Sequence, residues 1–250
     1  IIAKLCNSSF KKCTLPADQK RAVTRPLLKK PTLDPSDMNS FRPISNLSFP
    51  SKTVERLVDS RPTRLVAHAE RYSLLPTFQA AYRARHSTET LLVRLYNDMV
   101  AVVDKGEVGI LVLLDMSSAF DTIDHDVMIE VLQRRFCVQD AALDWFRSYI
   151  TDRTQIVVNG TGSSSVVKTN TGVPQGSVLG PRSFVAYAED VSDVFSQRRV
   201  SHHLFADDMQ GMCHAKPHNV ADAVTRLESS VMYIRCWQSV QLKTLITTKH

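Results

Sequence analysis

The sequence predicts an α+β fold in which helices cover one face of a mainly antiparallel sheet. Three observations lead to this prediction: a continuous apolar run at residues 108–115, a turn signal at residues 159–162, and helical periodicity at residues 218–237. The chain has 250 residues, enough for one large domain or two small ones. Its 43% of hydrophobic and 22% of charged residues exclude a chain that is disordered throughout.

The first hundred residues are expected to pass from extended chain into helices. Residues 24–50 contain five prolines, which favour extended segments and turns. Residues 52–70 have a helical pattern with a break near Pro62. Residues 86–104 carry one apolar stripe behind the candidate N-caps Ser87 and Thr88, so a capped helix is expected there.

The central part of the chain is expected to contain a strand, two helices and a hairpin. The run VGILVLLD at residues 108–115 is short, continuous and rich in Val and Ile, which is typical of a strand buried on both faces. Helices are predicted at about residues 124–136 and 140–151. Short strands at residues 154–158 and 165–170 flank the sequence Asn159-Gly160-Thr161-Gly162, a strong hairpin signal.

The last third of the chain returns to the sheet and ends in a helix. Residues 172–181 are predicted to form a loop that enters a helix running to about Phe195. Strands at residues 200–205 and 209–213 are expected on either side of Asp207 and Asp208. Residues 218–237 read as an amphipathic helix.

Positive charge is concentrated near the N-terminus. The formal net charge is +6, and residues 1–30 hold eight Lys or Arg against one Asp. Such a basic end suits a polyanionic partner, although a solvated surface explains the same charges. The five cysteines are an odd number without a Cys-x-x-Cys pair, which argues against a disulfide framework and fits a reducing compartment. No membrane span or signal peptide is visible, and the missing initiator Met indicates a piece of a longer protein.

Three carboxylates are the main candidates for chemistry. Asp115 ends the apolar strand, and Asp207 and Asp208 occupy the tip of a hairpin. Two like charges about 4 Å apart repel by roughly 4 kcal/mol at an effective dielectric constant of about 20. Buried carboxylates therefore need protonation, a basic partner or a bound cation, and no Lys or Arg is adjacent in the sequence. The pattern predicts a site for hard divalent cations such as Mg²⁺, and the alternative is that the Asp207-Asp208 pair forms an ordinary polar turn.

Several ordered motifs extend this pattern to a family resemblance. The central motifs are LLDMSSAFDTIDH (113–125), GVPQGSVLGP (172–181) and FADDMQ (205–210). Upstream segments of the same kind are PLLKKPTLDP (26–35), FRPISNLSF (41–49) and QAAYRARHSTET (79–90). Together they resemble the reverse transcriptase domain of non-LTR (LINE-type) retrotransposons, of the chicken-repeat and jockey type. The resemblance covers about residues 8–237.

The resemblance implies a role for each of several residues. The catalytic aspartates would be Asp115, Asp207 and Asp208, which would hold two Mg²⁺ ions, or Mn²⁺, with help from the carbonyl of Met116. Phe120 would lie under the sugar of the incoming nucleotide and exclude a 2′-hydroxyl.

Other implied contacts lie in the Pro174-Gln175-Gly176 loop and the upstream segments. Gln175 would reach the sugar or base, and Gly176 would allow the backbone to approach the nucleotide closely. Arg42 and Arg83 are candidates for the triphosphate or the template backbone.

One residue departs from the family pattern, and a lysine near the C-terminus stands at the family's distance from Trp237. Arg182 replaces an apolar residue and is expected to disturb helix packing. Lys249 is a weak candidate for protonating the leaving pyrophosphate.

The resemblance also implies an architecture and partners. It predicts the fingers and palm of a right-hand polymerase with the thumb absent or truncated. Residues 1–105 would form a basic segment and the fingers, and residues 106–250 the palm, with a finger-side insertion at about 127–170. The expected activity is RNA-directed DNA synthesis from deoxynucleoside triphosphates (dNTPs), on an RNA template with a DNA primer or nicked target DNA.

The resemblance further implies that the protein is made in the cytoplasm and acts in the nucleus, without a membrane partner. It also implies that an endonuclease domain lies outside this chain. The alternative is a catalytically inactive remnant that still binds nucleic acid.

Overall fold

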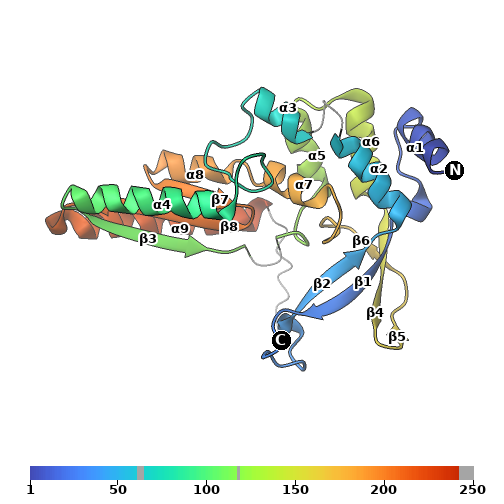
Figure 1. Cartoon of the computed structure of the whole chain (residues 1–250), viewed down its shortest axis with the longest axis horizontal. Helices are drawn as coiled ribbons and strands as arrows, with labels where there is room; N and C mark the ends of the chain where they lie inside the picture. The colour runs from blue at the N-terminus through green and yellow to red at the C-terminus, as the bar shows by residue number, and fades with distance from the viewer. Residues whose placement is uncertain (61–64, 117–118, 242–250) are drawn as a thin grey trace. The chain divides into compact units, whose positions relative to one another are not determined.

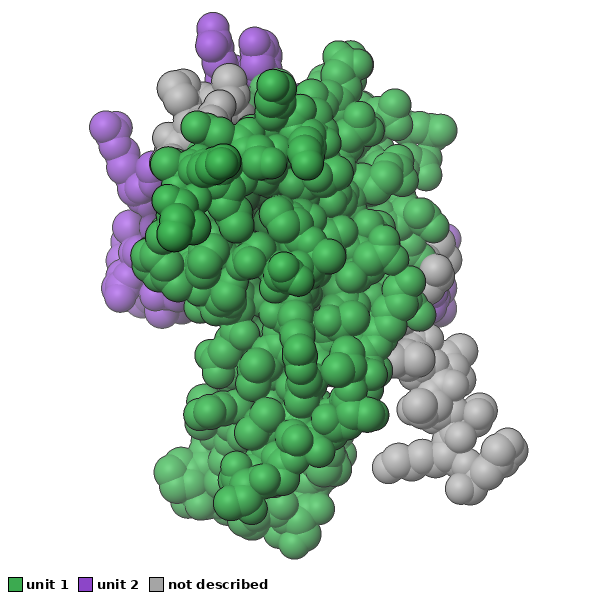
Figure 2. Space-filling model, turned by 90° about the vertical axis from the view of Figure 1, so that its right-hand side faces the viewer, with its two compact units in different colours: residues 1–68, 120–183 green, residues 69–119, 184–250 purple. Residues whose placement is uncertain are grey.

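Two structural units interleave along the chain in the computed structural model, which describes residues 1–60, 65–116 and 119–241. Unit 1 comprises Ile1–His68 and Phe120–Ser183, and unit 2 comprises Ala69–Ala119 and Phe184–His250. Figure 2 colours the two units separately. The boundary predicted at residues 105 and 106 falls inside unit 2, and the predicted insertion at 127–170 lies within unit 1.

Unit 2 is built on a three-stranded antiparallel sheet (Figure 1). Its strand order is β3-β8-β7, so β8 is the central strand. Leu114 pairs with Met209, and Phe205 pairs with Asp208 across the hairpin. The elements of this unit are β3 (Val108–Leu114), β7 (Ser201–Phe205), β8 (Asp208–Ala215), α4 (Thr88–Asp104), α8 (Val191–Gln197) and α9 (Val220–Gln241).

Helices pack on both faces of this sheet, so the expectation of helices on one face only was wrong. A Cβ added to Gly109 of β3 would lie 3.1 Å from the Met99 methyl carbon of α4. A Cβ added to Gly211 of β8 would lie 2.9 Å from the ring of Phe195 in α8. The strand register places these two glycines on opposite faces. We call the sheet face that carries Gly109 the α4 face and the face that carries Gly211 the α8 face.

Strand β3 lies at the edge of the sheet rather than in its interior. Leu113 is 68% exposed, and exposure alternates from Ile110 to Leu114. The predicted burial on both faces was therefore wrong, because α4 covers only part of its face of the sheet and no described strand pairs with the outer side of β3. A continuous apolar run does not distinguish a central strand from a half-covered edge strand.

Unit 1 combines a second sheet with a helical layer. Its strand order is β2-β1-β4-β5, and β6 also pairs with β4. Strand β1 pairs with β2 antiparallel and with β4 parallel, which joins segments far apart in the sequence. The elements of this unit are α1 (Ile2–Lys11), β1 (Arg21–Leu28), β2 (Phe41–Asn46), α2 (Phe49–Ser60), α5 (His125–Arg134), α6 (Asp140–Ile150), β4 (Arg153–Asn159), β5 (Gly162–Ser163) and β6 (Val167–Thr169).

Most of the predicted helices are present, with two differences. The Ser87 hydroxyl accepts a hydrogen bond from the Thr90 amide in a capping box, and the Asp124 carboxylate caps α5. The long helix predicted up to Phe195 is two helices, α7 (Gly180–Tyr187) and α8. Helix α1 was not predicted. Helix α3 (Leu65–Arg71) follows the residues around Pro62, which lie outside the described part of the chain.

Among the described residues, no helix is both long and apolar enough to cross a membrane.

Candidate functional site

Two of the three predicted aspartates line one pocket on the α4 face of unit 2. Asp115 follows the last residue of β3, and Asp208 is the first residue of β8, which pairs with β3. The pocket has a volume of about 370 Å³. Its other lining residues are Thr88, Leu91, Leu92, Leu113, Leu114, Phe205, Met209 and Gln210. The antiparallel pairing therefore brings together carboxylates that are far apart in the sequence.

These carboxylates lie at the surface of the pocket rather than in the core. Asp115 and Asp208 are exposed, and Asp207 is half-buried in the turn between β7 and β8. The sequence analysis treated these carboxylates as buried, and this was wrong for Asp115 and Asp208, because Asp115 ends an edge strand and Asp208 lies at the hairpin turn. Both exposed side chains are accessible to ligands.

The turn that carries Asp207 is held from outside the hairpin by Gln79. The Gln79 side chain is 3% exposed, and its Oε1 accepts hydrogen bonds from the amides of Ala81 (3.0 Å) and Ala206 (3.1 Å). Ala206 has a φ of +56°, a left-handed conformation that costs a non-glycine residue about 1 kcal/mol or more. The Gln79 side chain therefore helps to fix a strained residue directly before Asp207.

The same segment runs beside β7 as a short parallel partner. The Leu204 amide donates to the Phe78 carbonyl at 3.0 Å, and the Ala80 amide donates to the Leu204 carbonyl at 2.9 Å. Tyr82 follows in this segment, and burial together with the charge of Asp207 raises the pKa of its phenol. No sequence pattern marked Gln79 or Tyr82 as part of the site, although both lie in the segment QAAYRARHSTET.

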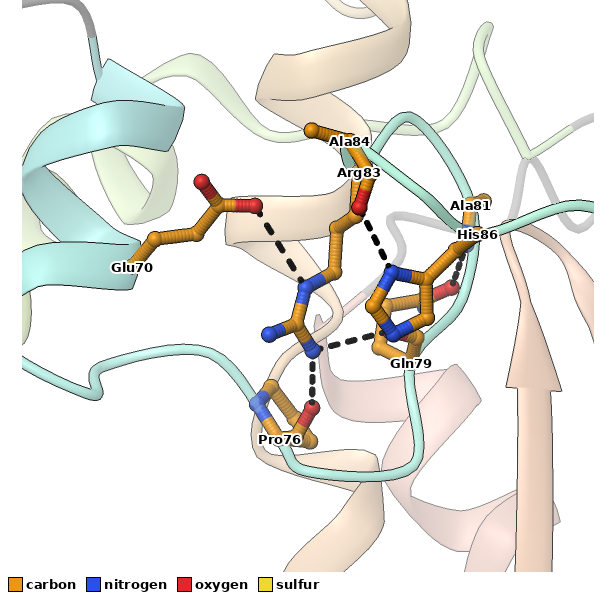
Figure 3. Close-up of polar contacts among 7 residues, drawn as sticks. All are labelled: Glu70, Pro76, Gln79, Ala81, Arg83, Ala84 and His86. Atoms are coloured by element: carbon orange, nitrogen blue, oxygen red, sulfur yellow. Dashed lines mark hydrogen bonds and ion pairs between the residues drawn. The ribbon is translucent and has the colours of Figure 1, made fainter.

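Arg83 stabilises this segment, as Figure 3 shows. Its Nη1 donates to the carbonyls of Pro76 (3.2 Å) and Gln79 (3.0 Å), and its Nε lies 3.7 Å from Glu70 Oε1. The guanidinium therefore has structural partners that a sequence motif does not reveal. The predicted role of Arg83 toward phosphate stays a prediction.

The donor set of the pocket fits a hard cation. Within the part of the chain that the structure describes, no three His, Cys, Asp or Glu side chains converge closely enough to form a ready metal site. Asp115 and Asp208 nevertheless present carboxylate oxygens, the ligands that Mg²⁺ prefers, in one pocket with room for water and phosphate. The Met116 side chain is only 2% exposed, and the role of its carbonyl stays a prediction.

The predicted nucleotide-binding loop in unit 1 is anchored to strand β2. The Gln175 carbonyl accepts a hydrogen bond of 2.7 Å from the Ser45 amide. Gly176 has a φ of +114°, and a Cβ there would lie 2.8 Å from the Ser45 carbonyl oxygen. Any larger residue would clash with β2, so this contact alone requires a glycine at position 176.

A buried carboxylate holds the other end of this loop. Glu55 of α2 is 0% exposed, and its Oε2 accepts hydrogen bonds from the amides of Val178 (2.7 Å) and Leu179 (3.1 Å). The Tyr149 hydroxyl donates to the same oxygen at 3.3 Å, and burial raises the pKa of Tyr149 far above its usual range. Glu55 was missed because it stands alone in the sequence among ordinary helix residues.

Phe120 and Arg42 lie in unit 1 as well. The Phe120 carbonyl accepts a hydrogen bond of 2.8 Å from the Val173 amide, and its ring is partly exposed. Arg42 is exposed on β2. Lys249 lies outside the described residues.

Arg182 forms an ion pair with Asp59 of α2, and its predicted effect on helix packing stays a prediction. The Asp59 carboxylate offsets the positive charge of the partly buried Arg182 guanidinium, which would be costly to bury alone. Burial also lowers the pKa of Arg182.

Comparisons with known proteins agree with this geometry. The family described as "Reverse transcriptase (RNA-dependent DNA polymerase)" matches residues 28–235. The RNA-directed DNA polymerase from mobile element jockey of Drosophila melanogaster is 31% identical over 165 residues, which is 66% of this chain and 18% of that protein. The probable RNA-directed DNA polymerase from transposon BS of the same species is 32% identical over 166 residues, with the same shares covered. The chain thus spans less than a fifth of the length of these relatives.

A solved structure shares the fold. Telomerase from Candida albicans, solved with a fragment of telomeric RNA, superposes with a TM-score of 0.57 at 15% sequence identity. The match covers 90% of this chain and 43% of the telomerase chain.

Proposed function

This chain belongs to the reverse transcriptase (RNA-dependent DNA polymerase) family, and on that premise we propose that it extends a DNA primer on an RNA template. The prediction of a LINE-type reverse transcriptase domain is confirmed by the jockey and BS relatives. The proposed reaction transfers a nucleotidyl group from a dNTP to the primer 3′-hydroxyl and releases pyrophosphate. Such a reaction depends mainly on positioning and on neutralising charge.

The single observation that supports this proposal most is the shared pocket of Asp115 and Asp208. Two exposed carboxylates from adjacent strands line a cavity of about 370 Å³, beside a turn fixed by Gln79. An isolated polar turn would not need a second carboxylate from a different strand in the same cavity. This pairing favours a reacting site over the alternative of an ordinary turn.

Divalent cations belong to the same proposal. Asp115, Asp207 and Asp208 would hold two Mg²⁺ ions, or Mn²⁺ in their place. The ions would supply charge neutralisation at the attacking and leaving oxygens. The three carboxylates would fix the positions of the two cations. Gln79 would keep Asp207 and Asp208 in place through its hydrogen bond to the Ala206 amide.

The remaining assignments follow the family pattern. The sheet of unit 2 would serve as the palm. Phe120 would exclude a 2′-hydroxyl, and Gln175 and Gly176 would contact the incoming nucleotide. Arg42 would bind phosphate from its exposed position on β2.

The proposed partners are an RNA template and a DNA primer. In a cell, the primer would be the nicked end of target DNA in the nucleus. The relatives are much longer than this chain, which leaves room for an endonuclease domain elsewhere in such a protein.

Primer extension tests the proposal directly. The 250-residue chain is incubated with a primed RNA template, Mg²⁺ and dNTPs, and compared with Asp208→Asn. Losing several kcal/mol of charge stabilisation lowers the extension rate by about 100-fold or more. Asp222→Asn, which changes an exposed carboxylate of α9, is the matched control and leaves the rate unchanged.

The outcome that contradicts the proposal is equally clear. A chain that binds the primed template but never extends it would favour the inactive remnant. Equal rates for Asp208→Asn and the control would remove the aspartates from the chemistry.

A further inference from the structure

Gln210 carries a buried oxygen that has no hydrogen-bond donor. It lies on β8 two residues beyond Asp208 and lines the pocket of Asp115 and Asp208, which we call the aspartate pocket. Its Oε1 is enclosed by protein, yet it accepts no hydrogen bond from the residues that the structure describes. Such an atom has lost its contacts with water and gained none in return, which costs stability. A methionine of similar volume would avoid that cost, so folding alone does not account for a glutamine at this position.

The other side chains of the aspartate pocket do not supply the missing donor. Leu113 of β3 is the cross-strand partner of Gln210 on one side and is apolar. The remaining lining residues are apolar or acidic except Thr88, whose hydroxyl makes no hydrogen bond to Oε1. A donor that reaches Oε1 from the pocket therefore has to belong to a bound molecule.

His203 of β7 is the cross-strand partner of Gln210 on the other side. Directly opposite residues of an antiparallel pair point to the same face, so both side chains lie on the α4 face. His203 Nε2 lies 2.8 Å from Asp98 Oδ2, so Nε2 carries the proton that this carboxylate accepts. The Nδ1 atom of the neutral ring is then an acceptor. His203 can therefore accept a hydrogen bond from the nitrogen of the Gln210 amide.

A half-turn of the Gln210 amide gives both of its ends a partner. The last torsion of a glutamine side chain is soft and roughly twofold, so Oε1 and Nε2 exchange places easily. After the turn, Nε2 donates to His203 Nδ1, and Oε1 faces the pocket. Two residues of strand separate Gln210 from Asp208 by about 7 Å. A water molecule on Mg²⁺ lies about 2.1 Å from the ion and donates over about 2.8 Å, so it bridges most of this spacing.

Water molecules on a cation are donors that suit this oxygen. Mg²⁺ usually keeps several of its waters in a protein site. The lone pairs of these waters point at the ion, so the waters donate hydrogen bonds outward. An amide oxygen complements such a donor, whereas the leucines of the pocket cannot.

We propose that Gln210 is a positioning residue for a cation at Asp115 and Asp208, and that its amide oxygen accepts a hydrogen bond from a water molecule on that cation. The proposal rests on the proposed function, which places the cation in the aspartate pocket. Asp98 fixes the ring of His203, and His203 fixes the direction of the Gln210 amide. Gln210 thereby orients the hydrated ion without contacting it directly.

Binding of Mn²⁺ alone, without nucleic acid, tests this role. Electron paramagnetic resonance measures the dissociation constant of Mn²⁺ for the 250-residue chain and its variants. Gln210→Met removes the acceptor at similar volume, and Gln210→Glu keeps an acceptor oxygen there. Gln197→Met, on an exposed position of α8, is the matched control. Asp208→Asn identifies the ions that bind in the aspartate pocket.

Gln210→Met is expected to weaken Mn²⁺ binding by about 10-fold, a usual effect of removing a group that hydrogen-bonds to a metal ligand. Gln210→Glu and Gln197→Met bind Mn²⁺ at least as tightly as the unsubstituted chain. Without metal, the melting temperature of Gln210→Met rises by about 2–4 °C, because the unsatisfied oxygen is gone. Unfolding then does not explain the lost affinity.

Primer extension supplies a second measurement. In Gln210→Met, the Mg²⁺ concentration that gives half of the maximal rate rises by about 10-fold, and added Mg²⁺ restores most of the lost rate. A purely structural role for Gln210 would instead lower the rate at every Mg²⁺ concentration, which would contradict the proposal.

His203→Gln tests the contact that directs the amide. This variant keeps a donor for Asp98 and removes the Nδ1 acceptor. It is expected to weaken Mn²⁺ binding in the unsubstituted chain and to have no further effect in Gln210→Met, because His203 acts through Gln210. Independent losses from the two substitutions would contradict the part assigned to His203.

The Mn²⁺ measurements separate failure of this proposal from failure of the proposed function. Binding that requires Asp208 but is unchanged in Gln210→Met would overturn the role of Gln210 and leave the polymerase function intact. A lower melting temperature of metal-free Gln210→Met would also overturn it, since Oε1 would then have a partner in the folded chain. Binding that Asp208→Asn leaves unchanged would contradict the cation site of the proposed function, and the role of Gln210 with it.

Discussion

Glu55 shows what a single buried carboxylate does for a functional loop. It accepts hydrogen bonds from two consecutive amides, those of Val178 and Leu179, and from the Tyr149 hydroxyl. Consecutive amides that point at one oxygen fix the direction of the chain between them. The loop that carries Gln175 is thus held at Ser45 on one side and at Glu55 on the other.

The variant Glu55→Gln tests this anchor. The amide side chain that replaces the carboxylate keeps one acceptor oxygen but removes the charge that strengthens these hydrogen bonds, so the free energy of unfolding falls by about 2 kcal/mol. Urea unfolding measures the change, with the exposed Glu228→Gln as control. A loss equal to that of the control would show that Glu55 does not anchor the loop.

Gln79 has a comparable role beside the aspartates. Gln79→Met keeps the volume and removes the acceptor, which leaves the amides of Ala81 and Ala206 without their partner. We expect a stability loss of about 1–3 kcal/mol. Primer extension slows by more than the loss of folded protein explains, because the Asp207-Asp208 turn is no longer fixed. Gln133→Met, on an exposed position of α5, is the control, and a rate that follows stability alone would contradict the positioning role.

At the scale of elements, strand β7 separates two neighbouring histidines onto opposite faces of the sheet. His203 faces α4 and pairs with Asp98, while His202 faces α8 and is hydrogen-bonded to Ser192 at 2.6 Å. His202 Nδ1 lies 3.4 Å from the Val200 carbonyl, so Nδ1 donates and Nε2 accepts from the Ser192 hydroxyl. Burial lowers the pKa of His202, which keeps this ring neutral.

The lowered pKa of His202 makes the stability of the fold depend on pH. Below about pH 6.5 the unfolded chain binds a proton at this residue, whereas the folded chain does not until its lower pKa is reached. Stability is therefore complete above about pH 6.5 and falls as the pH decreases, with a slope of at most about 1.4 kcal/mol per pH unit from this group.

Chemical unfolding between neutral and mildly acidic pH measures this slope. His202→Gln flattens the profile, and His218→Gln, at an exposed position, leaves it unchanged. If the unsubstituted chain and both variants showed the same slope of unfolding free energy against pH, the pH dependence would come from groups other than His202.

At the scale of the whole molecule, local patterns predicted the elements and long-range contacts decided the rest. The cap of α4 and the hairpin around Asp207 were predictable, because each depends on a few adjacent residues. The apolar run at β3 did not reveal an edge strand, since strand order depends on which other segments pair with it. The ion pair of Arg182 with Asp59 and the anchors Gln79 and Glu55 depend on residues distant in sequence, so no local signal marked them.

The interleaved course of the chain has a consequence for its synthesis on the ribosome. Strand β3 leaves the exit tunnel long before its partner β8, because the whole second segment of unit 1 is made between them. A nascent chain that stops at residue 183 therefore displays an apolar strand with unsatisfied backbone groups on both edges, a configuration prone to aggregation. We expect fragment 1–183 to precipitate in a translation extract while the complete chain stays in the supernatant, and equal solubility of the two would contradict this.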